Sequence, residues 1–186
     1  MFLRLLMCLL PMCLFGVEGA LEVRGGYFRF ANSTAREIYG GGAPDVELEG
    51  IFFVNRYLNP WINANYIWKG GKTEALSSRT DLKMGVFSFG TKFFFPYKAA
   101  KRFYLGVGPC AGYLQIHDHS SFVPRKTVRW GGGVVGKSGL FFGNRKLFLD
   151  LFFDYYYLPI RTRSSVSENS IDLGGFRIGA GLGSFF

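Results

Sequence analysis

The sequence predicts an all-β protein, a transmembrane antiparallel barrel, and three observations support this fold class. Apolar and polar residues alternate with period two in segments of about ten residues, the pattern of strands with one face in lipid. The connections between these segments alternate between short and long. Aromatic residues make up 18% of the chain and glycines number 26, as is typical of walls with aromatic girdles and narrow interiors. No segment after the N-terminus offers the roughly eighteen apolar residues that a spanning helix needs.

The N-terminus is predicted to be a cleavable signal peptide over residues 1–19. Arg4 supplies a short positive region, residues 5–15 form an apolar run, and small residues precede Ala20. The predicted organisation is therefore a signal peptide at 1–19 and a single barrel domain at 20–186. After cleavage Cys110 is the only cysteine left, so no intramolecular disulfide is expected.

Eight segments carry the two-faced pattern and are predicted to form an up-and-down barrel. They are residues 22–31, 45–55, 60–68, 81–95, 103–115, 130–142, 146–157 and 170–186. The three short connections, 56–59, 96–102 and 143–145, are typical of tight turns. The four long ones are polar and turn-rich: 32–44, 69–80, 116–129 and 158–169. We expect the turns in the periplasm and the loops outside the cell.

The first segment, 22–31, leaves its two faces undecided. Phe28 and Phe30 share a parity with Glu22 and Arg24. Either the aromatic residues face lipid together with two charges, or the charges face the lumen together with two rings. The first alternative would place Arg29 inside the barrel.

The second segment separates its faces clearly. The outward positions are Val46, Leu48, Phe52 and Val54, and the inward ones are Asp45, Glu47 and Glu49. Segment 146–157 is equally clear. Its outward residues are Leu147, Leu149, Leu151, Phe153, Tyr155 and Tyr157, and Asp150 and Asp154 face inward.

Two more segments and the last one follow the same rule. In 81–95 the outward residues are Phe87, Phe89, Phe93 and Phe95, with Ser88, Gly90 and Lys92 inward. In 130–142 they are Val134, Leu140 and Phe142, with Lys137 inward. The last segment directs Phe176, Ile178, Ala180, Leu182 and Phe186 outward, with Arg177 and glycines inward. The aromatic runs 93–97 and 155–157 are interpreted as belts at the membrane interfaces.

The inward charges are predicted to pair inside the lumen. They are Asp45, Glu47, Glu49, Lys92, Lys137, Asp150, Asp154 and Arg177. An eight-stranded barrel is just wide enough inside for side chains, and buried charges need partners. We therefore expect an ion-pair network that blocks solutes and makes the barrel an anchor or scaffold. A gated proton or ion path is the alternative, with Arg177 opposite Asp150 or Asp154 at its core.

The formal net charge of +9 lies mainly in the connections. Lipopolysaccharide phosphates are an anionic neighbour for basic loops, at roughly 1 kcal/mol per cation near such a surface. Simple solubility of exposed loops is an equally good explanation. Because the cations lie outside the wall, nucleic acid is not expected as a partner.

One loop carries the only histidines, His117 and His119, on either side of Asp118. Two imidazoles on one side of an extended chain are able to share a metal, but a structural zinc site needs four ligands, so a solvated loop is favoured. His119 and Ser121 also match the His-x-Ser arrangement of outer-membrane lipid A deacylases, as base and nucleophile of a lipid esterase. This two-residue match is weak, and we expect neither an enzyme nor a cofactor.

Two stretches carry a wider resemblance. Residues 104–108 with Gly112 and Tyr113, together with the ending 179–186, resemble the small outer-membrane β-barrel superfamily of opacity-type, OmpA, OmpX and OmpW barrels. The resemblance implies a location in the outer membrane. It also implies insertion by the barrel assembly machinery, which reads a last strand ending in an aromatic residue, here Phe186. Ser184 departs from the apolar residue usual two positions before the end.

The leading hypothesis is a structural, surface-exposed outer-membrane barrel, monomeric because a closed barrel has no free edge. Its basic loops would contact lipopolysaccharide, or a host or matrix ligand. A narrow OmpW-type channel for small solutes is the alternative from the transport class. That channel would need an apolar lumen, and Glu47, Glu49 and Lys137 argue against it.

Overall fold

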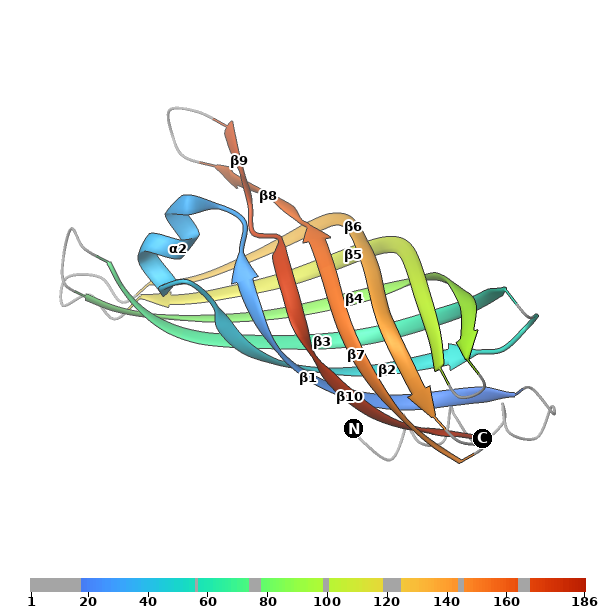
Figure 1. The fold of residues 1–186 in the computed structure, drawn as a ribbon. Helices are drawn as coiled ribbons and strands as arrows, with labels where there is room; N and C mark the ends of the chain where they lie inside the picture. Colours follow the sequence, from blue (N-terminus) through green and yellow to red (C-terminus); the bar gives the residue numbers. More distant parts are fainter. Residues whose placement is uncertain are drawn as a thin grey trace.

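A closed antiparallel barrel of eight strands forms the body of the protein, in the order β1-β10-β7-β6-β5-β4-β3-β2 (Figure 1). The computed structural model describes residues 18–55, 57–73, 78–98, 101–118, 125–143, 146–163 and 168–186. The barrel strands are β1 (Gly19–Phe30), β2 (Ala43–Phe52), β3 (Leu58–Thr73), β4 (Ser78–Lys98), β5 (Lys101–Asp118), β6 (Arg125–Gly143), β7 (Leu147–Tyr157) and β10 (Gly175–Phe185). The predicted eight-stranded, up-and-down barrel is confirmed.

The barrel has two different ends. At the turn end, short connections join β2 to β3, β4 to β5 and β6 to β7, and both ends of the described chain lie there (Figure 1). At the loop end lie the helix α2 (Ser33–Tyr39) and a hairpin of β8 (Pro159–Arg163) and β9 (Glu168–Asp172). Within the described part of the chain, no helix is long and apolar enough to cross a membrane.

Strands β3 to β6 are longer than predicted at the loop end. The β3–β4 pairing continues to Thr73↔Ser78, and the β5–β6 pairing continues to Asp118↔Arg125. By contrast, β2 pairs with β3 only as far as Asp45↔Ile67. The four strands therefore project beyond the rest of the wall (Figure 1). The polar residues there end the apolar alternation used to predict the strands, but backbone pairing does not require that alternation.

The predicted strand 170–186 is wrong at its start, because residues 170–172 belong to β9. Leu173 and Gly174 separate β9 from β10. The Asp172 carboxylate accepts hydrogen bonds from the backbone N–H groups of Leu158 at 2.9 Å and Gly174 at 2.8 Å. An aspartate that captures nearby N–H groups in this way forms a turn in place of a continued strand.

The first long connection, predicted to be a loop, contains the helix α2. Asn32 caps its N-terminus, because its side-chain oxygen accepts from the Ala35 N–H at 3.2 Å. Gly40, at φ 62°, follows its last turn, and only glycine adopts that conformation without strain. Ala35 and Tyr39 are buried, so the helix packs its apolar face on the loop end of the barrel.

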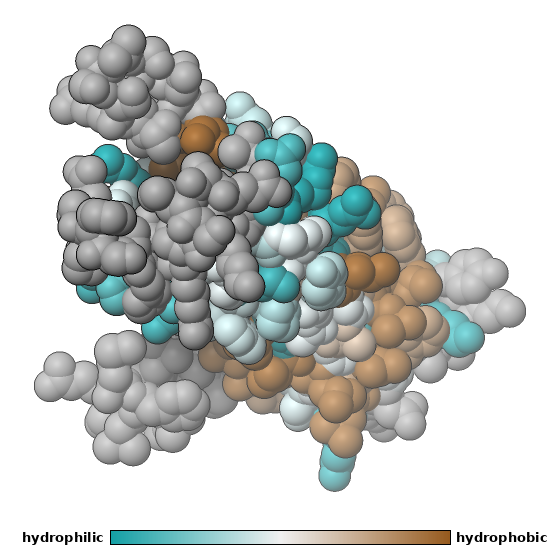
Figure 2. Space-filling view, turned by 90° about the vertical axis from the view of Figure 1, so that its left-hand side faces the viewer, coloured by the Kyte–Doolittle hydropathy of each residue, from teal (hydrophilic) through white to brown (hydrophobic). Residues whose placement is uncertain are grey.

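The outer face of the wall is apolar. In β7, Leu149, Leu151 and Phe153 are each between 40% and 47% exposed, while their chain neighbours are buried. The residues predicted to face outward in β2, β4, β6 and β7 all do so. Figure 2 looks at the loop end and shows hydrophobic side chains gathered on the wall, with hydrophilic ones nearer that end.

Strand β1 places two of its charges and two of its aromatic rings on the same, inner face. Glu22, Arg24, Phe28 and Phe30 are all at most 1% exposed. Arg29 is exposed on the outer face, so the alternative that places it in the lumen is wrong. The belt interpretation of the aromatic runs also needs correction, because Phe94 and Tyr156 are buried inside the barrel.

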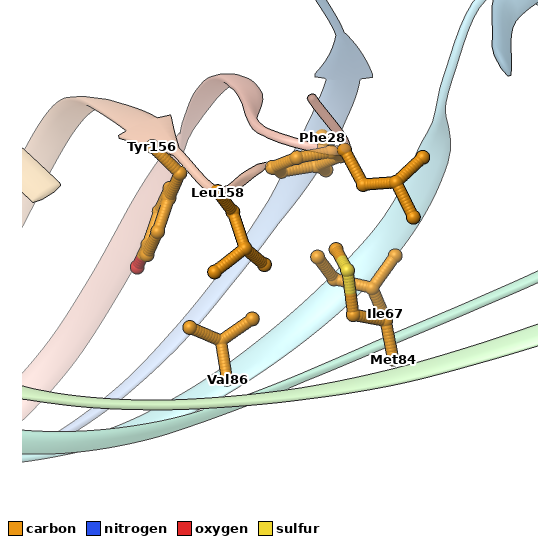
Figure 3. A pocket seen from close by; sticks show the side chains of 7 residues that line it. Phe28, Ile67, Met84, Val86, Tyr156 and Leu158 are labelled. Atoms are coloured by element: carbon orange, nitrogen blue, oxygen red, sulfur yellow. The ribbon is translucent and has the colours of Figure 1, made fainter. Parts of the chain in front are cut away.

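Aromatic rings face inward at two levels, because the lumen is filled by successive layers of side chains. Five phenylalanines pack together at the turn end and form what we call the aromatic layer: Phe53, Phe94, Phe141, Phe148 and Phe185. At the loop end an apolar layer lines a closely packed pocket that has no room for a water molecule (Figure 3). Its members are Phe28, Ile67, Met84, Val86, Tyr156, Leu158 and Leu173. Ionisable side chains fill the space between these layers.

Candidate functional site

The middle of the lumen holds ten ionisable side chains, each at most 4% exposed, which we call the charged layer. They are Glu22, Arg24, Asp45, Glu47, Glu49, Lys92, Lys137, Asp150, Asp154 and Arg177. The eight residues proposed for the lumen from the sequence are all among them. Period-two alternation brings them together, because six strands each direct alternate positions to the same interior.

Arg24 on β1 contacts more carboxylates than any other cation of the charged layer. Its Nη1 donates to Glu47 at 2.8 Å and to Asp154 at 3.2 Å. Its Nη2 donates to Asp150 at 2.7 Å and also to the Tyr104 hydroxyl, which in turn donates to Asp150 at 2.9 Å. One guanidinium thus connects β1 with β2, β5 and β7 across the lumen.

Arg177 on β10 is the second bridging cation. It donates through Nε to Asp45, and through Nη1 to Glu47 at 2.7 Å and Asp154 at 3.3 Å. Of the two partners proposed from the sequence, Arg177 therefore meets Asp154, whereas Asp150 binds Arg24. The Phe152 ring lies 4.0 Å from the Arg24 guanidinium and 4.4 Å from that of Arg177, so it contacts both cations.

The two lysines bind the acids of β2. Lys137 donates to Glu47 at 2.9 Å and to Glu49 at 2.6 Å, and Lys92 donates to Glu49. The Lys137 ammonium also lies 4.6 Å from the Trp61 ring centre, and that of Lys92 lies 4.3 Å from the Tyr104 ring centre. Glu47 receives both arginines, Lys137 and the Tyr156 hydroxyl, so it is the common acceptor of the network.

The β3 side of the lumen is polar but uncharged. Asn63 and Ser88 hydrogen-bond to each other, and Asn65 donates to Asp45 at 3.2 Å. These amides face the charged layer without adding charge to it. The cations therefore find their partners on β1, β2 and β7.

The network also contains Glu22, Arg24, Tyr104 and Tyr156, which were not predicted to belong to it. A signal for Arg24 was present, because a cation on the lipid face at mid-membrane costs about 2–4 kcal/mol. In β1 this cost places Arg24 in the lumen, regardless of which face Phe28 and Phe30 occupy. Tyrosines on an inner face carry no such signal, because their rings are equally common in the outer belts.

The chemistry proposed for the third long loop is not located by the structure. His119 and Ser121 lie outside the described residues. His117 is in β5, in register with Asp81 of β4 and Lys126 of β6. Among the described residues, no group of three or more His, Cys, Asp or Glu side chains is placed to hold a metal ion.

The residues proposed as an assembly signal face outward from β10 and the chain end. Phe176, Ile178, Leu182 and Phe186 are between 43% and 69% exposed, and Ala180 shares their face. The Phe186 N–H donates to the Gly19 carbonyl at 2.9 Å, and the Gly19 N–H donates back to the Phe186 carbonyl at 3.0 Å. The last residue thus closes the barrel against the first strand.

The architecture is similar to that of small outer-membrane barrels of known structure. Neisserial surface protein A has 12% identity and a TM-score of 0.65, over 92% of this chain and 97% of that one. The outer membrane protein OprG of Pseudomonas aeruginosa has 13% identity and a TM-score of 0.61, over 90% and 96%. Ail, the attachment invasion locus protein of Yersinia pestis, was solved with the heparin analogue sucrose octasulfate. It has 15% identity and a TM-score of 0.60, over 91% and 99%.

No protein-family model matches the sequence, and no curated relative does. The likeness to solved structures therefore shows the eight-stranded barrel fold of outer-membrane proteins.

Proposed function

We propose that this chain is an integral outer-membrane barrel with a structural and surface-interaction role, closed by its own side chains and binding anionic lipopolysaccharide at its loop end. The observation that supports this proposal is the inverted distribution of side chains across the barrel wall. Leucine, valine and phenylalanine cover the outside, and ten ionisable groups fill the inside. That distribution is stable when the outer face contacts hydrocarbon.

The lumen argues for a scaffold rather than a pore. The charged layer spans the interior from β1 to β7 through ion pairs of 2.6–3.3 Å. The aromatic layer then closes the turn end, where the Phe141 and Phe148 rings stack at 3.9 Å. A solute would have to separate both layers, and the OmpW-type channel loses support for that reason.

The loop end carries cations on the outer face, level with aromatic side chains or a short way beyond them. Lys83 is in register with Trp68, which stacks on Tyr66 at 5.8 Å. Lys126 lies on the same outward parity as Trp130, two rows nearer the loop tip. Aromatic side chains of this kind form the girdle at a membrane interface, so the cations lie at the level of the lipid headgroups.

A third cation extends this rim around the barrel. Arg29 of β1 is in register with Phe176 of β10, whose ring lies 4.8 Å from that of Tyr155. We define Arg29, Lys83 and Lys126 as the cationic rim. Each cation near an anionic surface contributes roughly 1 kcal/mol, so the three together would strengthen binding by about a hundredfold.

Two measurements test this function. Refolded protein in a planar bilayer should give no discrete conductance, after heat-dependent gel mobility has shown that the barrel is folded. Openings abolished by Arg177→Ala would mean that the charged layer conducts, and would contradict the closed lumen.

Lipopolysaccharide binding is tested with vesicles that contain or lack it. Combining Arg29→Ala, Lys83→Ala and Lys126→Ala should weaken binding by up to about a hundredfold. A matched control removes Lys101 and Lys146, two exposed lysines of the turn end. Equal losses in both variants would contradict the rim. Sucrose octasulfate, which Ail binds, serves as a competitor that separates general anion binding from lipopolysaccharide binding.

The remaining parts of the proposal concern assembly. We infer that residues 1–19 are removed as a signal peptide, that the outward face of β10 with Phe186 is read by the barrel assembly machinery, and that the barrel is a monomer. Mass spectrometry of the exported chain tests the cleavage position. Phe186→Ala should lower the yield of folded barrel in the outer membrane, while Leu21→Ala, an outward residue of β1, should not.

A further inference from the structure

The positive and negative charges of the charged layer are unequal in number. Six carboxylates, Glu22, Asp45, Glu47, Glu49, Asp150 and Asp154, face four cations, Arg24, Lys92, Lys137 and Arg177. Fully ionised, the layer would carry two excess negative charges. All ten groups are withdrawn from solvent, and a buried charge without a counter-charge is expensive enough that the group neutralises instead.

Glu22 is the carboxylate with the least compensation. It is fully buried, and among the described residues neither of its oxygens has a hydrogen-bond partner. Within the same part of the chain it forms one ion pair, with Arg24 Nε, at 3.3 Å from Oε1. The same guanidinium also pairs with Glu47, Glu49, Asp150 and Asp154, so one positive charge is divided among five carboxylates. By contrast, Glu49 accepts hydrogen bonds from both lysines.

The neighbouring strands bring two carboxylates and one cation to Glu22. Glu49 of β2 stands directly opposite it in the β1–β2 register. Asp150 of β7 and Lys92 of β4 also act on it, in addition to Arg24 of its own strand. Lys92 is already bound to Glu49.

Strand β10 contributes glycine in place of a donor. A Cβ atom at Gly181 would lie 1.9 Å from Glu22 Oε1, so the carboxyl group rests against the bare backbone there. Among the described residues, no three His, Cys, Asp or Glu side chains converge to hold a metal ion, either here or elsewhere. The geometry thus leaves the Glu22 carboxyl group packed tightly, without a hydrogen-bond donor or metal ligands beside it, and a proton is the ligand small enough to bind there.

We propose that the charged layer is a proton-binding site and that Glu22 holds the proton at neutral pH. A proton from water joins one Glu22 oxygen and leaves a neutral carboxylic acid beside Asp150 and Glu49. Two like-charged carboxylates at close range favour protonation of one of them. The inference rests on the sealed lumen alone and does not depend on what the cationic rim binds.

Infrared difference spectroscopy of the refolded barrel in lipid vesicles tests the proposal directly. A protonated carboxylic acid gives a C=O stretching band that ionised carboxylates lack, and the band shifts in deuterated water. We expect this band at pH 7 in the native protein and its loss in Glu22→Gln. In the matched control Asp45→Asn, which removes a carboxylate that is bound by Arg177 and Asn65 and lies opposite Gly26 rather than Glu22, the band should remain. A native spectrum without the band, or a band that survives Glu22→Gln, would overturn the proposal.

A second readout does not need the Glu22 variant to fold. In Asp150→Asn the charge facing Glu22 is gone, so the Glu22 carboxyl ionises more easily and the band should weaken. Since the folded barrel would hold a proton that the unfolded chain releases, the urea midpoint of the native protein should fall as pH rises from about 4.3, the ordinary pKa of a glutamate side chain, through neutral. A midpoint that rises over that range would contradict the site.

Discussion

The charged layer and the aromatic layer fill neighbouring parts of the same lumen in opposite ways. In the charged layer a single guanidinium, that of Arg24, serves five carboxylates at 2.7–3.6 Å. In the aromatic layer five rings from five chain segments meet with centroids 3.9–6.1 Å apart and no polar contact is needed. Ions must be placed individually, whereas rings need only volume. The first layer therefore specifies register and the second seals the end.

The largest effect should follow from removing the shared cation. Arg24→Met leaves Glu47, Asp150 and Asp154 without their common partner, and uncompensated buried charge costs about 3–5 kcal/mol. The free energy of unfolding, measured in urea with lipid vesicles, should fall by that amount. Arg29→Met, on the outer face of the same strand, should change it by less than about 0.5 kcal/mol. Equal losses would remove the distinction between the two faces of β1.

A smaller effect is expected when both members of a pair are removed together. Lys92→Met and Glu49→Gln should each destabilise the barrel, and the double variant should be more stable than their sum predicts by about 0.5–3 kcal/mol. The reason is that the second substitution removes a partner that the first had stranded. The same urea titrations supply all four corners of this cycle. Strict additivity would show that Lys92 and Glu49 do not act as a pair.

The aromatic layer should tolerate a change of shape. Phe141→Leu keeps an apolar side chain of similar volume, so we expect a loss of about 1 kcal/mol or less in the free energy of unfolding. Phe89→Leu, on the outer wall of β4, is the matched control and should change it less. If Phe141→Leu cost as much as Arg24→Met, the aromatic layer would be as specific as the ionic one.

Salt should have the smallest effect. Raising the ionic strength from about 0.1 M to about 1 M shortens the screening length from about 10 Å to about 3 Å, but only where solvent reaches the charges. The charged layer is sealed at both ends, so the urea midpoint should barely move. In the same experiment, lipopolysaccharide binding at the exposed cationic rim should weaken markedly. A salt-sensitive midpoint would indicate that water and ions enter the lumen.

The layered lumen also explains what the sequence was able to predict. Strand β2 has acids at Asp45, Glu47 and Glu49 on one parity and apolar residues on the other, so both faces follow from the alternation. Strand β1 crosses from the charged layer into the apolar layer, so its inner face reads Glu22, Arg24 and then Phe28. A rule that assigns every aromatic residue to the lipid-facing side therefore fails where β1 passes from the charged layer to the apolar layer.

The extended loop end was missed for a different reason. Beyond Trp68 of β3 and Val128 of β6 the two strands continue with polar residues and glycines, so no periodic signal remains although hydrogen bonding continues to Thr73 and Arg125. Contacts across the lumen were beyond sequence reasoning as well. Arg24 and Asp154 are 130 positions apart, and only closure of the barrel brings them to 3.2 Å.

The glycine face of β10 determines which parts of such a chain are free to diverge. A Cβ atom at Gly179 would lie 2.1 Å from the Gly25 carbonyl oxygen, and one at Gly183 would lie 2.1 Å from the Phe148 ring. Outward positions such as Ile178 and Leu182 accept any residue that dissolves in lipid. Substitutions should therefore be tolerated mainly at the outward positions, whereas the glycine positions of β10 tolerate few of them. Sequence similarity between such barrels is for that reason expected to be lost sooner than similarity of fold.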